Sequence, residues 1–174
     1  MVLYFENRHS YAHSFDTVTL AYLNRYPNPY AKHVKLSDTL ERYVDGAGRL
    51  WTTKLVVKTG RLPKFIEPFL GKALDLWIIE KLVIDPKRQT MHTYTANVDH
   101  RRFIQVEERL DYATADGVTT VDLKVKFSLN FTGFKQKIEQ WLKNKFLSNM
   151  NNTREGLKFV MNQLHEYRAR RVAT

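Results

Sequence analysis

Basic and imidazole side chains flank a proline-rich segment near the start of the chain. Arg25 and His33 lie at its two ends, with Pro27 and Pro29 between them. Proline lacks a backbone N–H, clashes with the preceding helical turn, and pushes the residue before it into extended geometry. Residues 24–33, called here the proline corner, therefore form a rigid corner that holds two groups able to bind an anion. A solvated turn between a helix and a strand is the alternative interpretation.

Two further cations fall on one predicted strand, residues 50–58. Lys54 and Lys58 share one face of it, because alternate side chains of a strand point the same way. A lysine on a covered face is costly without a partner, so each either faces solvent or faces a cavity that holds an anion. We expect solvent for Lys54. We expect Lys58, which precedes Gly60 and Arg61, to lie at the mouth of a pocket.

A third polar group lies on a long helix predicted from residue 132 to about 168. Lys145, Asn149 and Asn152 stack on one side of it, next to an apolar stripe. A lysine and two amides beside apolar surface suit an anionic head group next to a hydrophobic cavity, although a simple solvent boundary would give the same pattern. The apolar stripe consists of Phe134, Ile138, Leu142, Phe146, Met150, Leu157, Met161 and Leu164.

Residues 60–72 break the strand pattern and read as a lid. Glycines at the two ends supply flexibility, and Pro63 and Pro68 interrupt regular structure. Apolar side chains beside lysine and arginine suit contact with an anionic bilayer interface. A short amphipathic helix packed on the core is the alternative, and both states could alternate. The predicted lid and membrane-contact residues are Leu62, Lys64, Phe65, Ile66, Phe69 and Leu70.

Composition limits the class of protein. The chain has 174 residues, of which 43% are hydrophobic, and this suits one domain with a sizeable core. It has no cysteine, which excludes disulfides, thiolate metal sites and a cysteine nucleophile. No apolar run approaches the roughly 18 residues of a membrane span, and residues 1–7 resemble neither a secretory signal nor a transit peptide. The net charge of +10 favours an anionic partner: a membrane, nucleic acid or an acidic protein.

Enzymatic patterns are missing from the sequence. The six histidines show no metal-ligand spacing, and no HExxH, GxSxG, P-loop or GxGxxG motif occurs. Glu107 and Glu108 are consecutive on a predicted strand, so they point to opposite faces and cannot form a carboxylate dyad. Glu80 and Glu107 could be buried, in which case we expect each to pair with a lysine or arginine. We therefore expect no enzyme, no metal and no cofactor.

The order of elements predicts an α+β fold. Successive strands with hairpin-length connections imply an antiparallel sheet of about seven strands, and a short early helix and a long final helix must cover one face of it. A strongly curved sheet of this kind leaves a cavity under the long helix. Residues 34–44 alternate apolar and polar types and predict a half-buried strand. The predicted strands are 3–9, 34–44, 50–58, 74–84, 90–98, 103–112 and 118–129, and the helices are 14–23 and 132–168.

Several segments, in order, resemble the PRELI family of mitochondrial intermembrane-space lipid-transfer proteins. The most specific is the Arg-Tyr-Pro-Asn-Pro-Tyr string of residues 25–30. The resemblance covers nearly the whole chain and is strongest to the fungal phosphatidic acid carriers, which support cardiolipin accumulation. The other matching segments are residues 1–3, 61–63, 77–80, 83–86, 90–95, 106–108 and 145–146.

The resemblance implies a helix-grip, START-like domain over residues 1–170, followed by a tail at 171–174. It implies transfer of phosphatidic acid between the mitochondrial outer and inner membranes, without bond making or breaking. The expected location is the intermembrane space, peripherally on the inner membrane, after import without a cleaved presequence. The implied partners are phosphatidic acid, anionic membranes and a small helical protein with paired cysteine motifs, which forms a heterodimer with the carrier.

The same resemblance implies a set of lipid-binding residues. One position departs from the family pattern, because a lysine is expected where this chain has Asn152, and the neutral amide removes one positive charge. Transfer of another anionic phospholipid, such as phosphatidylserine, is an alternative. A basic nucleic-acid-binding module is a second alternative, but the chain has no compact motif of that kind, and we expect no nucleic acid partner. The implied lipid-binding residues are Arg25, His33, Lys58, Arg61, Lys145, Asn149 and Asn152.

Overall fold

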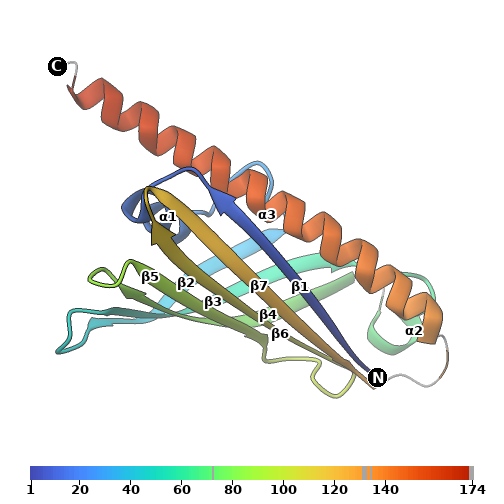
Figure 1. The fold of residues 1–174 in the computed structure, drawn as a ribbon. Coiled ribbons are helices and arrows are strands. Elements are labelled where there is room, and N and C mark those ends of the chain that lie inside the picture. Colours follow the sequence, from blue (N-terminus) through green and yellow to red (C-terminus); the bar gives the residue numbers. More distant parts are fainter. Residues whose placement is uncertain (72, 131–132, 134, 173–174) are drawn as a thin grey trace.

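The computed structural model describes residues 1–71, 73–130, 133 and 135–172, which form seven strands and three helices. All seven strands belong to one antiparallel sheet in the order β1-β7-β6-β5-β4-β3-β2 (Figure 1). The strands are β1 (Val2–Tyr11), β2 (Val34–Val44), β3 (Leu50–Arg61), β4 (Ala73–Asp85), β5 (Thr90–Asn97), β6 (Ile104–Ala115) and β7 (Val118–Leu129).

The connection from β1 to β2 crosses the sheet from one edge strand to the other. β2 to β7 follow one another as neighbours, but β1 pairs with β7, so β1 and β2 lie at opposite edges. The connection between them contains α1 (Phe15–Leu23) and the proline corner. The long helix α3 (Lys135–Val172) passes over the same face of the sheet as α1 (Figure 1), and Arg168 Nη1 donates to Thr17 Oγ1 at 3.0 Å. The predicted helix-grip architecture is confirmed.

Two apolar clusters hold α3 to this inner face of the sheet. The larger cluster lies at the α1 end and includes Val18, Met91, Val121 and Met161, all fully buried. Burial of each such side chain stabilises the fold by about 1.5–3 kcal/mol. The smaller cluster lies at the opposite end and consists of Ile104, Leu129, Ile138 and Leu142. The predicted apolar stripe of α3 thus packs on the sheet along its described length; Phe134, its first member, lies outside the described residues.

The structure corrects the expected burial of residues 34–44. Nearly every residue of β2 is exposed, including Leu40 at 55%, whereas the alternating pattern predicts a half-buried strand. The reason is topological: β2 is an edge strand that pairs only with β3, at the edge farthest from β1. At the other end of the chain, α3 continues through Arg171 and Val172, two residues that the sequence assigns to a tail.

Other predicted boundaries shift by a few residues. β1, β3 and β6 each extend two or three residues farther than the pattern indicates at one end. The predicted helix start at Thr132 and the predicted lid end at Lys72 lie outside the described residues. Within the part of the chain that the structure describes, no helix is long and apolar enough to cross a membrane.

Candidate functional site

The inner face of the sheet is packed at one end and open at the other. Toward α1, inner-facing side chains such as Leu82 and Met91 are fully buried. Toward the other end, the inner-facing Lys58, Ile78 and Thr95 keep partial access to solvent although they face α3's side of the sheet. We call this open part of the inner face of β3–β6 the recess. Its edges are the proline corner, the segment that leads into α2 (Glu67–Leu70), and α3.

Arg25 lies at the deep end of the recess and is already paired. Its guanidinium forms an ion pair with Glu80, which is 2% exposed, and its Nη1 donates to the Tyr22 carbonyl oxygen at 2.9 Å. The guanidinium carbon also lies 4.0 Å from the centroid of the Tyr22 ring, and the Tyr22 hydroxyl donates to Glu80 Oε2 at 3.0 Å. The expected partnering of Glu80 with a cation is confirmed. Arg25 therefore ties α1 to β4, and most of its charge is balanced inside the protein.

Lys54 corrects a sequence-based expectation. It is 6% exposed and points to the inner face, where its Nζ donates to the Leu23 carbonyl oxygen at 3.2 Å. Leu23 is the last residue of α1, and a helix C-terminus attracts a cation. The register of β3 and β4 places Lys54 directly opposite Glu80. Burial and nearby Arg25 lower the pKa of Lys54, whereas Glu80 acts in the opposite direction.

Three predicted site residues come together at the outer rim of the recess. Burial lowers the pKa of His33, and the charges of Lys58 and Lys145 lower it further, so both lysines lie within electrostatic reach of His33. The Thr59 N–H donates to the His33 carbonyl oxygen at 2.8 Å and fixes the end of the proline corner against β3. Burial alone would raise the pKa of Tyr26, but Lys58 and Arg25 lie close enough to lower it. The rim is therefore a region of positive potential.

The polar stripe of α3 faces the proline corner. A Cβ added to Gly156 would lie 2.9 Å from Asn28 Oδ1, so glycine is what allows α3 and the corner to approach this closely. Lys145, Asn149 and Asn152 lie on the same side of α3 as Gly156 because their spacings of four, three and four residues stack on a helix. All three are exposed. They line up along the edge of the recess and do not enter it.

The predicted lid packs on the smaller apolar cluster. Ile66 is 2% exposed, and Phe65 lies against the cluster formed with Ile138 and Leu142 of α3. Leu62 is half-buried and Lys64 is exposed, so the segment presents a cation to solvent while its apolar residues point inward. Phe69 and Leu70 belong to α2, but their side chains lie outside the described part of the structure.

Arg61 does not join the cluster around Lys58. It ends β3 opposite Ala73 of β4, and its side chain is exposed. Lys58 and Arg61 are three positions apart on one strand. Because side chains alternate along a strand, the two point to opposite sides of the sheet. The structure thus places Lys58 and Lys145 within electrostatic reach of His33 and leaves Arg61 at the base of the lid.

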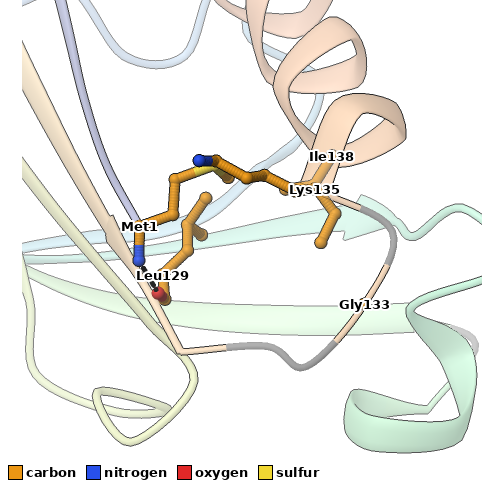
Figure 2. A pocket seen from close by; sticks show the side chains of 5 residues that line it. All are labelled: Met1, Leu129, Gly133, Lys135 and Ile138. Atoms are coloured by element: carbon orange, nitrogen blue, oxygen red, sulfur yellow. Dashed lines mark hydrogen bonds between the residues drawn. The ribbon is translucent and has the colours of Figure 1, made fainter.

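A small pocket, lined by three apolar side chains, Gly133 and Lys135, opens beside the lid end of the sheet. Its volume is about 320 Å³, within the usual size range of small-molecule sites. Figure 2 shows its lining: the Lys135 side chain extends from α3 toward the Met1 side chain, and the Met1 amino group donates to the Leu129 carbonyl oxygen at 2.7 Å. The pocket lies under the start of α3, so it adds apolar space next to the smaller cluster.

Sequence reasoning missed two side chains of the recess, Tyr26 and Glu108. Glu108 points inward from β6, opposite Thr95 of β5. Its neighbour Glu107 points outward, where it accepts a hydrogen bond from the Tyr94 hydroxyl at 2.7 Å, so the two carboxylates do lie on opposite faces as predicted. The signal that identifies Glu108 is strand register, which the local pattern does not contain. Among the described residues, no group of three histidine and acidic side chains could hold a metal ion.

Comparison with known proteins places this geometry in a family. The PRELI-like family model matches residues 16–167. "Protein UPS1, mitochondrial" of Saccharomyces cerevisiae is 43% identical over 171 residues, which cover 97% of this chain and 98% of that protein. "PRELI domain-containing protein 1, mitochondrial" of Homo sapiens is 32% identical, covering 94% of this chain and 77% of that protein.

Solved structures show the same fold at low sequence identity. The aromatase/cyclase Zhui of Streptomyces sp. R1128 is 11% identical, with a TM-score of 0.58, covering 94% of this chain and 96% of that one. This likeness supports the helix-grip fold alone. The family match and the level of identity to the mitochondrial relatives confirm the predicted resemblance: the chain belongs to the PRELI-like family, and its function is of the predicted class, lipid transfer in mitochondria.

Proposed function

We propose that this protein carries phosphatidic acid between the mitochondrial outer and inner membranes and so supplies cardiolipin synthesis. The observation that supports this most is that two lysines, Lys58 and Lys145, lie within electrostatic reach of His33 at the rim of the recess. A positive rim beside apolar space suits a ligand with an anionic head and hydrophobic tails. A phosphate monoester is a strong hydrogen-bond acceptor and would make charge-assisted bonds to both lysines.

A covered recess is needed because the acyl chains of the lipid must be kept out of water. Moving a lipid out of a bilayer exposes apolar surface at about 0.8 kcal/mol per CH₂ group. The small pocket under the start of α3 and the half-buried Ile78 offer a place to bury part of that surface. A two-chain lipid needs more room than about 320 Å³, so α3 and the lid would separate on loading. No bond is made or broken in this process, and the protein is not an enzyme.

The lid gives the carrier a way to reach the membrane. Phe65 and Ile66 are packed inward, and Lys64 is exposed beside them. When the segment swings away from α3, the two apolar side chains would enter the interfacial region while Lys64 and Arg61 meet anionic lipid. Phe69 and Leu70 would extend the same contact. The protein thus associates with the membrane surface peripherally.

The proposed location and partner follow the family. The protein acts in the intermembrane space, on the surface of the inner membrane, as a heterodimer with a small helical protein that has paired cysteine motifs. The outer face of the sheet would accept such a partner. It exposes Trp77, Tyr94 and Tyr43, and a hollow of about 480 Å³ lies beside the latter two.

Head-group choice distinguishes the main proposal from its alternatives. Phosphatidylserine carries an ammonium and a carboxylate next to its phosphate, and the neutral Asn152 would tolerate that larger head. Phosphatidic acid is favoured because the rim presents lysines, with Glu80 already used by Arg25. A nucleic-acid module would need an exposed basic surface with base contacts, and Arg25 and Lys54 are buried instead.

A vesicle assay tests the proposal. Donor vesicles contain equal amounts of phosphatidic acid, phosphatidylserine and phosphatidylcholine, and acceptor vesicles contain none of the three. Mass spectrometry of the acceptors should show phosphatidic acid appearing fastest and phosphatidylcholine not above the rate without protein. Equal transfer of all three lipids would contradict the proposal, and faster transfer of phosphatidylserine would replace it with the alternative cargo.

A further inference from the structure

The buried Glu80 carboxylate uses only one of its two oxygens. Its Oε2 accepts a hydrogen bond from the Tyr22 hydroxyl at 3.0 Å and also forms the ion pair with Arg25. Its Oε1 is buried and accepts no hydrogen bond from the described residues. Glu80 is 2% exposed, and a buried polar atom without a partner is an exception that needs a physical explanation. The carboxylate therefore has room for a second cation.

Lys54 is the cation nearest to that free oxygen along the sheet. The register of β3 and β4 places Lys54 directly opposite Glu80, and both side chains are buried. Directly opposite residues of an antiparallel pair have Cβ atoms about 4.5–5.5 Å apart, a distance that a lysine side chain spans. An ammonium has three N–H groups, and among the described residues the hydrogen-bond acceptor of Lys54 is the Leu23 carbonyl oxygen at 3.2 Å. Lys54 can therefore turn to Glu80 without any movement of its strand.

Arg25 contacts both the buried carboxylate and the rim of the recess. Its guanidinium carbon lies 4.0 Å from the ring centroid of Tyr22 and 4.6 Å from that of Tyr26. Tyr26 belongs to the rim, because Lys58 lies close enough to lower the pKa of its hydroxyl. A guanidinium presents a planar fork of donors that matches a phosphate, whereas an ammonium acts as a point charge. Arg25 is therefore the better phosphate ligand of the two buried cations, but Glu80 holds it.

Arg25 cannot leave Glu80 without a replacement. Removing one partner from a buried ion pair is strongly unfavourable, because an uncompensated charge stays behind. A lysine that moves onto the same carboxylate removes that cost, and it needs no new charge in the interior. The Tyr22 hydroxyl can continue to donate to Glu80 Oε2 during the exchange, so α1 stays attached to β4.

We propose that Lys54 is the reserve counter-ion of Glu80: when an anionic phosphate enters the recess, Lys54 pairs with Glu80, and Arg25 passes from Glu80 to the phosphate. This inference rests on the proposed function. Before loading, the Arg25–Glu80 pair holds the rim in place. After loading, Arg25 is a ligand of the phosphate, and Lys54 is a positioning residue that acts through Glu80. No proton is transferred, and the two cations and one carboxylate keep the same total charge.

A double-mutant cycle on lipid affinity tests the exchange. The full-length protein and its variants are titrated with a short-chain, water-soluble phosphatidic acid by calorimetry. Lys54→Gln keeps an N–H donor for the Leu23 carbonyl but loses the charge, and it should weaken binding by roughly tenfold. In the Glu80→Gln background, Arg25 needs no replacement, so the same substitution at Lys54 should have little effect. Lys54→Arg keeps the charge and should bind like the parent.

Lys81→Gln is the matched control, because Lys81 follows Glu80 on β4 and lies opposite the outward-facing Tyr94. It measures the effect of losing one positive charge on the other face of the sheet. The inference would be overturned if Lys54→Gln weakened binding no more than Lys81→Gln, or weakened it equally in the parent and in Glu80→Gln. Absence of binding by the parent would instead contradict the proposed function.

A spectroscopic signal tests the exchange even if Lys54→Gln fails to fold. The lysine Cε atoms are labelled with ¹³C, and the Lys54 resonance is the one that is missing from the spectrum of Lys54→Arg. It should shift in the parent at saturating lipid, because the ammonium gains the Glu80 carboxylate as a partner. The shift should be much smaller in Glu80→Gln. A Lys54 resonance that does not move when the parent is loaded, or that moves equally in Glu80→Gln, would overturn the inference.

Discussion

The two ends of the sheet's inner face differ in packing and in charge. At the α1 end, Val18, Met91 and Met161 are fully buried against one another, and close packing holds α1, α3 and the sheet together. At the recess end, side chains of similar position in their strands remain partly exposed, and several are charged. The packed α1 end stabilises the fold. The recess end can therefore contain charged side chains that a tightly packed apolar core would not accommodate.

Arg25 and Glu80 lie at the boundary between these two regions. Both are buried charges of the recess, and they are also the pair that attaches α1 to β4 through Tyr22. We therefore infer that the main role of the pair in the unloaded protein is to position the rim, where His33 and Lys58 lie. As a pair, it adds little net charge to the site. The distinction between positioning charges and binding charges can be tested with substitutions.

The largest expected effect is on stability, at this boundary. Arg25→Met removes the ion-pair partner of the buried Glu80 carboxylate and leaves Lys54 as the nearby cation, so the cost should be up to about 3–5 kcal/mol, the usual range for breaking a buried pair. Equilibrium urea unfolding measures the loss. The double variant Arg25→Met, Glu80→Leu should recover part of it, because the unpaired carboxylate is gone but the buried Lys54 loses the carboxylate opposite it. A single variant as stable as the parent would show that the pair does not attach α1 to β4.

The next effect contrasts the packed end with the recess. Met161→Ala should destabilise the protein by about 2–5 kcal/mol, since a fully buried side chain leaves a cavity. Ile78→Ala should cost about 1 kcal/mol, because Ile78 is only half-buried and its neighbours can adjust. Thermal and urea unfolding of both variants compare the two regions. Equal losses would mean that the recess is packed as tightly as the α1 end.

Lys58→Met should reverse that contrast, with a large effect on transfer and a small one on stability. Loss of one charged hydrogen bond weakens binding by about 1.5–3 kcal/mol, equivalent to roughly a tenfold to hundredfold decrease. Phosphatidic acid transfer between vesicles measures it. Lys87→Met, in the exposed turn between β4 and β5, is the control and should transfer normally. Parent-like transfer by Lys58→Met would remove Lys58 from the site.

A smaller effect is expected at the lid. Lys64→Met should weaken binding to vesicles that contain anionic lipid by about 1 kcal/mol, the usual contribution of one cation at such a surface. Co-sedimentation with vesicles at low and high salt measures it, and the difference from the parent should disappear at high salt. The same loss on neutral vesicles would mean that the substitution damages the packing of the lid, and that Lys64 makes no electrostatic contact with the membrane.

The smallest effect concerns His33 above neutral pH. Burial, Lys58 and Lys145 hold the pKa of His33 below its ordinary value of about 6.5, so the ring is neutral at pH 7 and gains its charge only as pH falls through the lowered pKa. His33→Gln should therefore change the pH profile of transfer below about pH 6.5 and leave its shape unchanged between pH 7 and pH 8. A changed slope between pH 7 and pH 8 would contradict the lowered pKa.

Local patterns predicted most of the elements. The prolines at 27 and 29 mark the end of α1, alternation marks the strands, and the three- and four-residue spacing along α3 marks the face that packs. These signals succeed because they depend on neighbours in the sequence. The exposure of β2 was predicted wrongly because it depends on where that strand lies in the sheet, and strand order is set by pairing between distant segments.

Site residues divide in the same way. The family resemblance identified His33, Lys58 and Lys145, and the structure places both lysines within electrostatic reach of the histidine. Lys54 was assigned to solvent because its two partners, the Leu23 carbonyl and Glu80, come from other elements. Glu108 was missed for the same reason. A buried charge is explained by its partner, and the partner is visible only once strand register and helix placement are known.

The most direct test of the recess as a head-group site is the lipid that the protein extracts. The purified protein is incubated with vesicles of equal phosphatidic acid and phosphatidylcholine content and separated from them, and its organic extract is analysed by quantitative mass spectrometry. The account predicts close to one phosphatidic acid per protein, with almost none in Lys58→Glu and a parent-like amount in Lys87→Glu. Extracted lipid in the same proportions as the vesicles, or equal loading of Lys58→Glu, would contradict it.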